Sequence, residues 1–158
     1  MKKILVLLVC FVSLAGVKNV AGQNIQSEVE SRRFKFVVNQ VIPSMTLDLS
    51  NYKAEGHISI TDSTSSASLP YFGITHQFNN TMDTKKMEWQ KKAIKDVQTE
   101  VNEKKGELKN MKFSFSVKAK DQNIYNFTMY IKKDGSCRIE FTGDNRSDIV
   151  YIGKIEAL

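Results

Sequence analysis

The residue types that carry most enzyme chemistry are sparse in this sequence. The chain has two histidines, His57 and His76, too few for a metal site of three imidazoles, and no H-E-x-x-H motif. A G-x-S-x-G nucleophile elbow and a glycine-rich phosphate loop are also absent. Carboxylates are scattered singly, and no spacing selects an acid/base pair. We therefore expect no enzyme activity, no metal and no cofactor.

The N-terminus has the pattern of a secretory signal peptide. A basic start is followed by an apolar run over 4–12 that is too short to span a bilayer, and small residues allow cleavage after Gly22. The pattern predicts a signal peptide over 1–22, a polar arm or short helix over 23–33 and a single domain over 34–158. Cys10 does not indicate a lipid anchor, because Val9 is too bulky for a lipoprotein site. We expect an exported protein, periplasmic or secreted, with no transmembrane segment after cleavage.

Charge and cysteine content limit the mature chain further. Three lysines and no acid leave with residues 1–22, so the formal net charge falls from +6 to +3. Such a mild charge does not favour a nucleic-acid partner. Cys137 is then the single cysteine, so an intramolecular disulfide is impossible, and its place among alternating apolar residues predicts a buried small hydrophobe.

Alternation of apolar and polar residues predicts antiparallel strands along most of the chain. The pattern recurs at 34–42, 45–49, 57–61, 113–117, 125–132, 137–141 and 149–155. Asp134-Gly135 gives the strongest hairpin signal. We predict a mainly β domain, a single antiparallel β-sandwich or small open barrel built from hairpins, with at most one or two short helices beside the signal-peptide helix.

One segment is ambiguous between helix and strand. Trp89, Ala93 and Val97 have helical spacing, whereas Val97, Thr99 and Val101 alternate. The turn signal at 102–106 and the strand that follows favour a strand for the second half. A helix over Lys85 to Asp96 stays the alternative.

The stretch Leu69–Gly73 combines large apolar side chains with proline and glycine, which restrict or free the backbone. Pro70 donates no hydrogen bond, so the stretch must be an edge or a corner, and Gly73 can take the positive φ of a sharp exit. We expect one of the rings of Tyr71 and Phe72 to enter the core, and the other to lie under a loop or at the surface.

The candidate ligand-binding residues are Tyr71, Phe72, Trp89 and Arg146, together with the polar loop over 75–86, which could form a binding lip. Core packing is the more frequent role for the three aromatic residues. The Arg146 guanidinium could bind a carboxylate or phosphate of a ligand, or it could donate hydrogen bonds to the carbonyl groups of its own turn. We favour the second, structural role. The partner is either an apolar or glycan ligand or an envelope protein.

The chain resembles a family of exported bacterial proteins known as domain of unknown function 4251, of Bacteroidetes type. The resemblance rests on Leu69-Pro70-Tyr71-Phe72-Gly73, Asp134-Gly135 and the pattern Asn145-Arg146-Ser147-x-Ile149-x-Tyr151-x-Gly153-x-Ile155. It covers about Phe34 to the C-terminus. It implies a β-hairpin over 87–117, a periplasmic or surface-exposed setting in a Gram-negative bacterium, and no assigned activity.

Three functions follow as hypotheses. The first is a non-catalytic binding module of the bacterial envelope, with a pocket near Tyr71, Phe72 and Trp89. The second is a protein-interaction or structural domain that uses a sheet edge. The third, an enzyme, has no supporting set of residues.

Overall fold

The computed structural model describes residues 20–49, 52–76, 81–120 and 122–158, so most of the predicted signal peptide lies outside the described residues. Within these ranges the elements are one helix and ten strands: α1 (Val20–Glu30), β1 (Arg33–Pro43), β2 (His57–Thr61), β3 (Thr64–Leu69), β4 (Gly73–Thr75), β5 (Thr81–Asp83), β6 (Met87–Lys104), β7 (Glu107–Lys118), β8 (Ile124–Lys132), β9 (Ser136–Gly143) and β10 (Arg146–Ala157).

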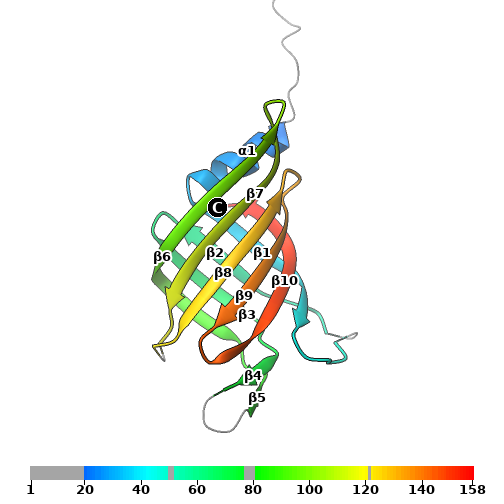
Figure 1. Cartoon of the computed structure of the whole chain (residues 1–158), viewed down its shortest axis with the longest axis vertical. Helices are drawn as coiled ribbons and strands as arrows, with labels where there is room; N and C mark the ends of the chain where they lie inside the picture. The colour runs from blue at the N-terminus through cyan, green and yellow to red at the C-terminus, as the bar shows by residue number, and fades with distance from the viewer. Residues whose placement is uncertain (1–19, 50–51, 77–80, 121) are drawn as a thin grey trace, which may run out of the picture.

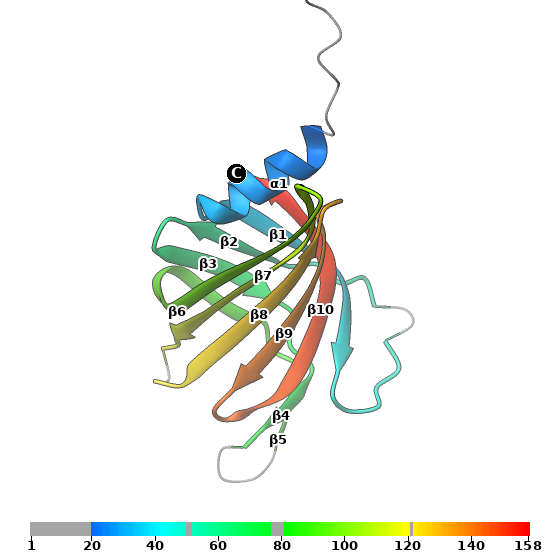
Figure 2. The same ribbon diagram turned by 45° about the horizontal axis from the view of Figure 1, so that its top comes forward.

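Eight of the strands form a closed antiparallel barrel (Figures 1 and 2). Their order is β1-β2-β3-β6-β7-β8-β9-β10, and β10 pairs again with β1. The predicted mainly β class is confirmed. Of the two predicted architectures, sandwich and barrel, the structure has the barrel. The expectation of an open barrel is wrong, because the pairing of β1 with β10 runs from Phe34 opposite Ala157 to Pro43 opposite Ile149. Closure leaves no unpaired edge between the first and last strands.

The barrel closes where a glycine lets two elements approach closely. A Cβ on Gly153 of β10 would lie 1.9 Å from the carbonyl oxygen of Val37 and 2.8 Å from the ring of Phe36. Only a residue without a side chain fits this contact. The requirement for glycine at this seam is therefore steric, and β1 has a bulge beside it, between Val38 and Gln40.

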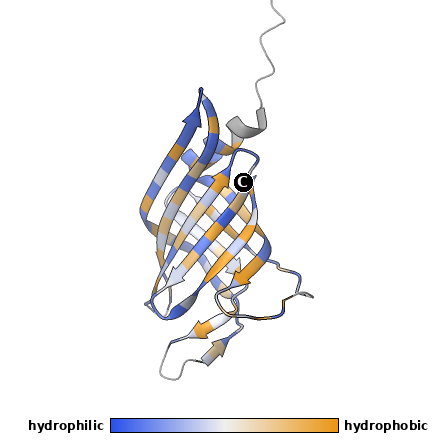
Figure 3. Cartoon of the chain, turned by 45° about the vertical axis from the view of Figure 1, so that its right-hand side comes forward, coloured by the Kyte–Doolittle hydropathy of each residue, from blue (hydrophilic) through white to orange (hydrophobic). Residues whose placement is uncertain are grey.

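The core is the barrel interior, filled by large rings. Inward positions alternate with outward ones along the strands, as Figure 3 shows by the bands of hydrophobic and hydrophilic residues. The fully buried aromatic side chains are Tyr71, Tyr151, Phe34, Phe36, Phe113, Phe115, Phe127 and Phe141. Helix α1 packs against β1, β7 and β10 across one end and buries Val29 there, so this end is covered (Figure 2).

Strand β6 resolves the ambiguous segment. It is one strand of 18 residues, and the helical alternative for Lys85 to Asp96 is wrong. Lys91 and Asp96 have positive φ values of 46° and 52°, and the register with the neighbouring strands shifts beside each of them. Each bulge inserts an extra residue and moves the inward set along by one. Two bulges therefore replace the period of two by the inward series Trp89, Ile94 and Val97, which looks helical in the sequence, whereas Ala93 is exposed.

Two local predictions differ from the structure. The alternating segment 45–49 has no strand partner, although Met45, Leu47 and Leu49 are half-buried, because the chain there is extended without joining the barrel. The predicted loop over 75–86 contains strand β5, which pairs with β4 in a small hairpin attached to the start of β10.

The contact at Gly153 gives a stability prediction. Gly153→Ala should lower the free energy of unfolding by about 2 kcal/mol, because the added methyl group must displace the backbone of β1. Gly106→Asn is the control: Gly106 has a positive φ that Asn tolerates, and nothing lies within 4 Å of its Cβ position. Urea unfolding measures both variants, and equal midpoints for the two would contradict the steric account of closure.

Candidate functional site

The corner formed by Pro70, Tyr71 and Phe72 closes the barrel end opposite α1. The corner joins β3 to β4, as predicted, and Tyr71 enters the barrel, where it is fully buried. Its hydroxyl oxygen lies 3.1 Å from the carbonyl oxygen of Ile74 and 3.2 Å from Ser147 Oγ. Tyr151 donates a hydrogen bond to the Pro70 carbonyl oxygen at 2.9 Å. The ring of Tyr71 is thus a plug held by hydrogen bonds.

Gly73 is needed for space and not for its backbone angle. Within the described residues, the glycines with positive φ are Gly106 and Gly135, so the predicted positive φ at Gly73 is wrong. A Cβ at Gly73 would lie 2.4 Å from Ser147 Oγ and 2.5 Å from the hydroxyl oxygen of Tyr71. The glycine therefore makes room for the hydrogen bonds around the plug.

Phe72 and Trp89 also pack within the protein. Phe72 is half-buried, and its ring meets that of Tyr52 edge-on, with 4.8 Å between the centroids, so a loop covers the second ring of the corner. Trp89 is 5% exposed and its Nε1 donates to Ser65 Oγ at 3.0 Å. Both residues stay candidates from the sequence, but neither offers an open face.

Arg146 ties the β4–β5 hairpin to the barrel. Its guanidinium carbon lies 4.6 Å from the centroid of the Tyr71 ring, so two of the four sequence candidates meet. Its Nε donates to the hydroxyl oxygen of Tyr125 at 3.0 Å, and its Nη1 donates to Asp83 Oδ2 at 2.9 Å. The side chains of Arg146 and Asp83 are 16% and 17% exposed. These contacts are structural, but their acceptors are a tyrosine hydroxyl and a carboxylate, and not the turn carbonyls that the sequence favoured.

The Asp83 carboxylate is stabilised in its charged form. Burial alone would raise its pKa, but the backbone amide of Lys85 and the guanidinium of Arg146 more than offset burial and lower the pKa below its usual range. Cys137 is buried as predicted, and burial raises the pKa of its thiol, so it carries no thiolate at neutral pH.

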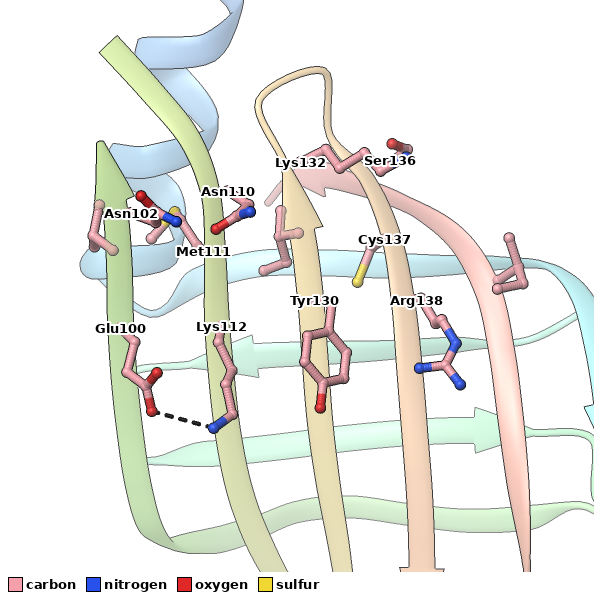
Figure 4. Close-up of a pocket in the computed structure, with 13 residues that line it drawn as sticks. Glu100, Asn102, Asn110, Met111, Lys112, Tyr130, Lys132, Ser136, Cys137 and Arg138 are labelled. Atoms are coloured by element: carbon pink, nitrogen blue, oxygen red, sulfur yellow. Dashed lines mark hydrogen bonds and ion pairs between the residues drawn. The ribbon is translucent and has the colours of Figure 1, made fainter. Parts of the chain in front are cut away.

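A broad depression of about 640 Å³ lies on the outer face of β6 to β10, seen in Figure 4 with β1 to β3 crossing behind. Outward-facing side chains from five adjacent strands form one row in register across it, hereafter the outer row. Its members are Glu100, Lys112, Tyr130, Arg138 and Ile152. The amides of Asn102 and Asn110 form the next paired row toward the hairpin tip.

The charges of the outer row are already paired. Lys112 Nζ lies 3.2 Å from Glu100 Oε1, and the guanidinium of Arg138 is paired with the carboxylate of Glu140. Tyr130 donates to Glu140 Oε2 at 3.3 Å and leaves 40% of its surface exposed. The row thus presents an aromatic face between fixed donors and acceptors.

Sequence reasoning missed the outer row, although one signal was present. Tyr130 falls on the polar face of the alternating segment 125–132, where an aromatic ring does not belong to the core, and the Arg138 guanidinium carbon lies 6.0 Å from its ring centroid. The strand register that aligns Tyr130 with Arg138 and Lys112 depends on how the hairpins pair, and the sequence alone does not specify that register.

Other kinds of site find no support in the described part of the chain. No group of three metal-ligating side chains occurs among the described residues. No helix in the same ranges is long and apolar enough to cross a membrane.

Comparison with known proteins gives one family. The model of the family described as domain of unknown function (DUF4251) matches residues 17–155. The match begins upstream of residue 34, where the resemblance was expected to start, and so includes α1. No curated protein matches the sequence.

The pair of Arg146 and Asp83 gives a pH prediction. Asp83→Asn should lower the free energy of unfolding by about 1 kcal/mol at pH 7, because it removes a partly buried charged hydrogen bond. A lowered folded pKa stabilises the fold above the ordinary value near 3.8, and this gain is lost as pH falls through the folded value. The difference between the two proteins should therefore vanish in acid.

Urea unfolding from pH 7 down to about pH 2 measures this difference. Glu55→Gln is the matched control. Glu55 forms an ion pair with Lys53, but the two side chains are 70% and 88% exposed, so the pair should contribute little to the free energy of unfolding. A difference for Asp83→Asn that is constant with pH would refute the role of charge.

Proposed function

Since the chain belongs to the family described as domain of unknown function (DUF4251), and that description assigns no activity, we propose a role from its own surface: a non-catalytic binding domain whose ligand lies across the outer row. The observation that carries this proposal is the exposed ring of Tyr130, aligned in register with paired charges over five strands. Such a strip suits an extended ligand.

The filled interior supports an external ligand over an internal one. Rings stack through the barrel, with Phe115 and Phe127 centroids 5.1 Å apart and Phe127 and Phe141 centroids 5.3 Å apart. The Tyr71 plug and helix α1 cover the two ends. A pocket beneath Phe72 and Trp89 would require these contacts to open.

The chemistry of the outer row favours a neutral glycan. The paired charges of the row offer hydrogen bonds but little net charge, which suits hydroxyl groups better than a phosphate or a carboxylate. The exposed face of Tyr130 suits the apolar face of a sugar ring, because tyrosine combines an apolar body with a polar tip. The amides of Asn102 and Asn110 extend the hydrogen-bonding surface.

We also propose an exported setting in the bacterial envelope. The basic and apolar start of the chain supports this setting, and the barrel strands all follow the predicted cleavage after Gly22. The resemblance to exported proteins of Bacteroidetes type agrees with it.

A second candidate function, interaction through a sheet edge, has its own observation. Strand β6 pairs with β3 only as far as Ala93, so from Lys95 to Lys104 one of its edges has no strand partner in the described part. An antiparallel second copy centred on Thr99 would place Val97 opposite Val101, and matched β-branched pairs stabilise sheets. The proposed partner is therefore a second copy of this chain.

The glycan proposal predicts the effect of Tyr130→Ala. Neutral oligosaccharides of glucose and of N-acetylglucosamine are the probes, and amide chemical shifts in NMR titrations locate them. At least one probe should shift the amides of Lys112, Tyr130 and Arg138. Loss of the ring should weaken that affinity about fivefold to tenfold, whereas Tyr130→Phe should keep most of it.

Ile124→Ala is the matched control for this experiment. Ile124 lies on the same strand, is 44% exposed and is outside the depression, so its removal should leave affinity unchanged. Shifts from no probe at these amides, or an equal loss in both alanine variants, would refute the glycan proposal.

The edge hypothesis predicts a concentration-dependent dimer. Light scattering after size exclusion should show the mass of two chains at high concentration, and Val101→Lys should restore the monomer because it places a charge in the paired edge. Ile124→Lys adds the same charge away from the edge and should leave the dimer intact. A monomer of the unaltered protein at all concentrations would eliminate this candidate.

A further inference from the structure

A second depression, of about 410 Å³, lies between the middle of β6 and the connection from β7 to β8. Four lysines line it, together with Ala93, Ala119 and Gln122, and we call it the lysine cleft. The lysines are Lys92, Lys95, Lys118 and Lys120. They come from two segments about 25 residues apart in the sequence, so the barrel pairing of β6 with β7 gathers them.

The positive charge of the lysine cleft is largely uncompensated. Within the described residues, none of the four lysines forms an ion pair. The nearby Asp96 carboxylate accepts a hydrogen bond from Ser116 Oγ at 2.7 Å. Four like charges around one depression repel each other, and a bound anion would relieve that repulsion.

The backbone around the lysine cleft is built to a fixed shape. The bulges at Lys91 and Asp96 bracket the two lysines on β6, and the amide of Lys91 donates to Ser66 Oγ at 2.9 Å. On the other side, the Ala119 amide donates to the Asn123 carbonyl oxygen at 2.9 Å and closes the connection. Bulges commonly redirect side chains beside functional sites. Lys92, Lys95 and Lys118 therefore project from strands, and Lys120 projects from the connection between β7 and β8.

We propose that the lysine cleft binds a phosphorylated ligand through two or more phosphate groups. Lysine ammonium groups bind phosphate as point charges from several directions, and the small Ala93 and Ala119 side chains leave room between them. Inorganic diphosphate and the headgroup of a phosphorylated lipid share this chemistry. The site is separate from the outer row and does not depend on the glycan proposal.

Titration with inorganic diphosphate, followed by amide chemical shifts at low salt, tests the proposal. The amides of Lys92, Lys95 and Lys118 should shift and saturate, and the affinity should fall as salt rises. Lys95→Gln combined with Lys118→Gln should weaken binding about tenfold or more, whereas arginine at both positions should keep it.

The control removes the same charge elsewhere on the β6–β7 hairpin. Lys104→Gln combined with Lys105→Gln should change the affinity less than about twofold, because the turn lies far along the hairpin from the lysine cleft. Equal losses in the two glutamine variants would refute a defined site, because they would show a response to overall charge alone.

Vesicles distinguish the two sources of phosphate. Sedimentation with phosphatidylcholine vesicles, with and without a phosphatidylinositol phosphate, is run beside the diphosphate titration. Saturable diphosphate binding supports the proposal, and added binding to the phosphorylated vesicles assigns a lipid source. Binding to vesicles without any diphosphate binding would overturn the proposal in favour of surface adsorption, as would no binding in either assay.

Discussion

The hydrogen-bonded pairing of β1 with β10 is the constraint on which the rest of the structure depends. It turns a sheet of consecutive hairpins into a closed barrel, and it encloses the aromatic core between covered ends. Gly153 permits this pairing because its missing side chain leaves space for β1. With the interior occupied by rings, the outer face and the strand edge become the surfaces available for recognition.

The strands and hairpins were predictable from the sequence wherever inward-facing and outward-facing residues alternate strictly. Residues 125–141 show this, since their alternation and the Asp134-Gly135 turn mark β8 and β9. Strand β6 was obscured because bulges at Lys91 and Asp96 shift the period. Closure and the outer row could not be predicted, because both depend on which strands pair and in what register. Gly73 was correctly selected, but its role is close approach and not a positive φ.

The surface divides its charges into two kinds of region. Along the outer row, each lysine or arginine has a carboxylate partner, so the field there is short-ranged. Around the lysine cleft, the ammonium groups have no described ion-pair partner, so their fields add. The lysine cleft thus gathers four like charges at one depression, and a chain of modest total charge can present a locally cationic site.

Closure by the first and last strands also shapes how the chain folds. Strands β6 to β10 pair with their neighbours in the sequence, so closing these pairs costs little chain entropy. The pairing of β1 with β10 joins the two ends of the domain, so we expect it to form late. Until that late step, two long strand edges are open to pairing with other chains. The seam at Gly153 is therefore also the place where the first and last strands cover each other's edges.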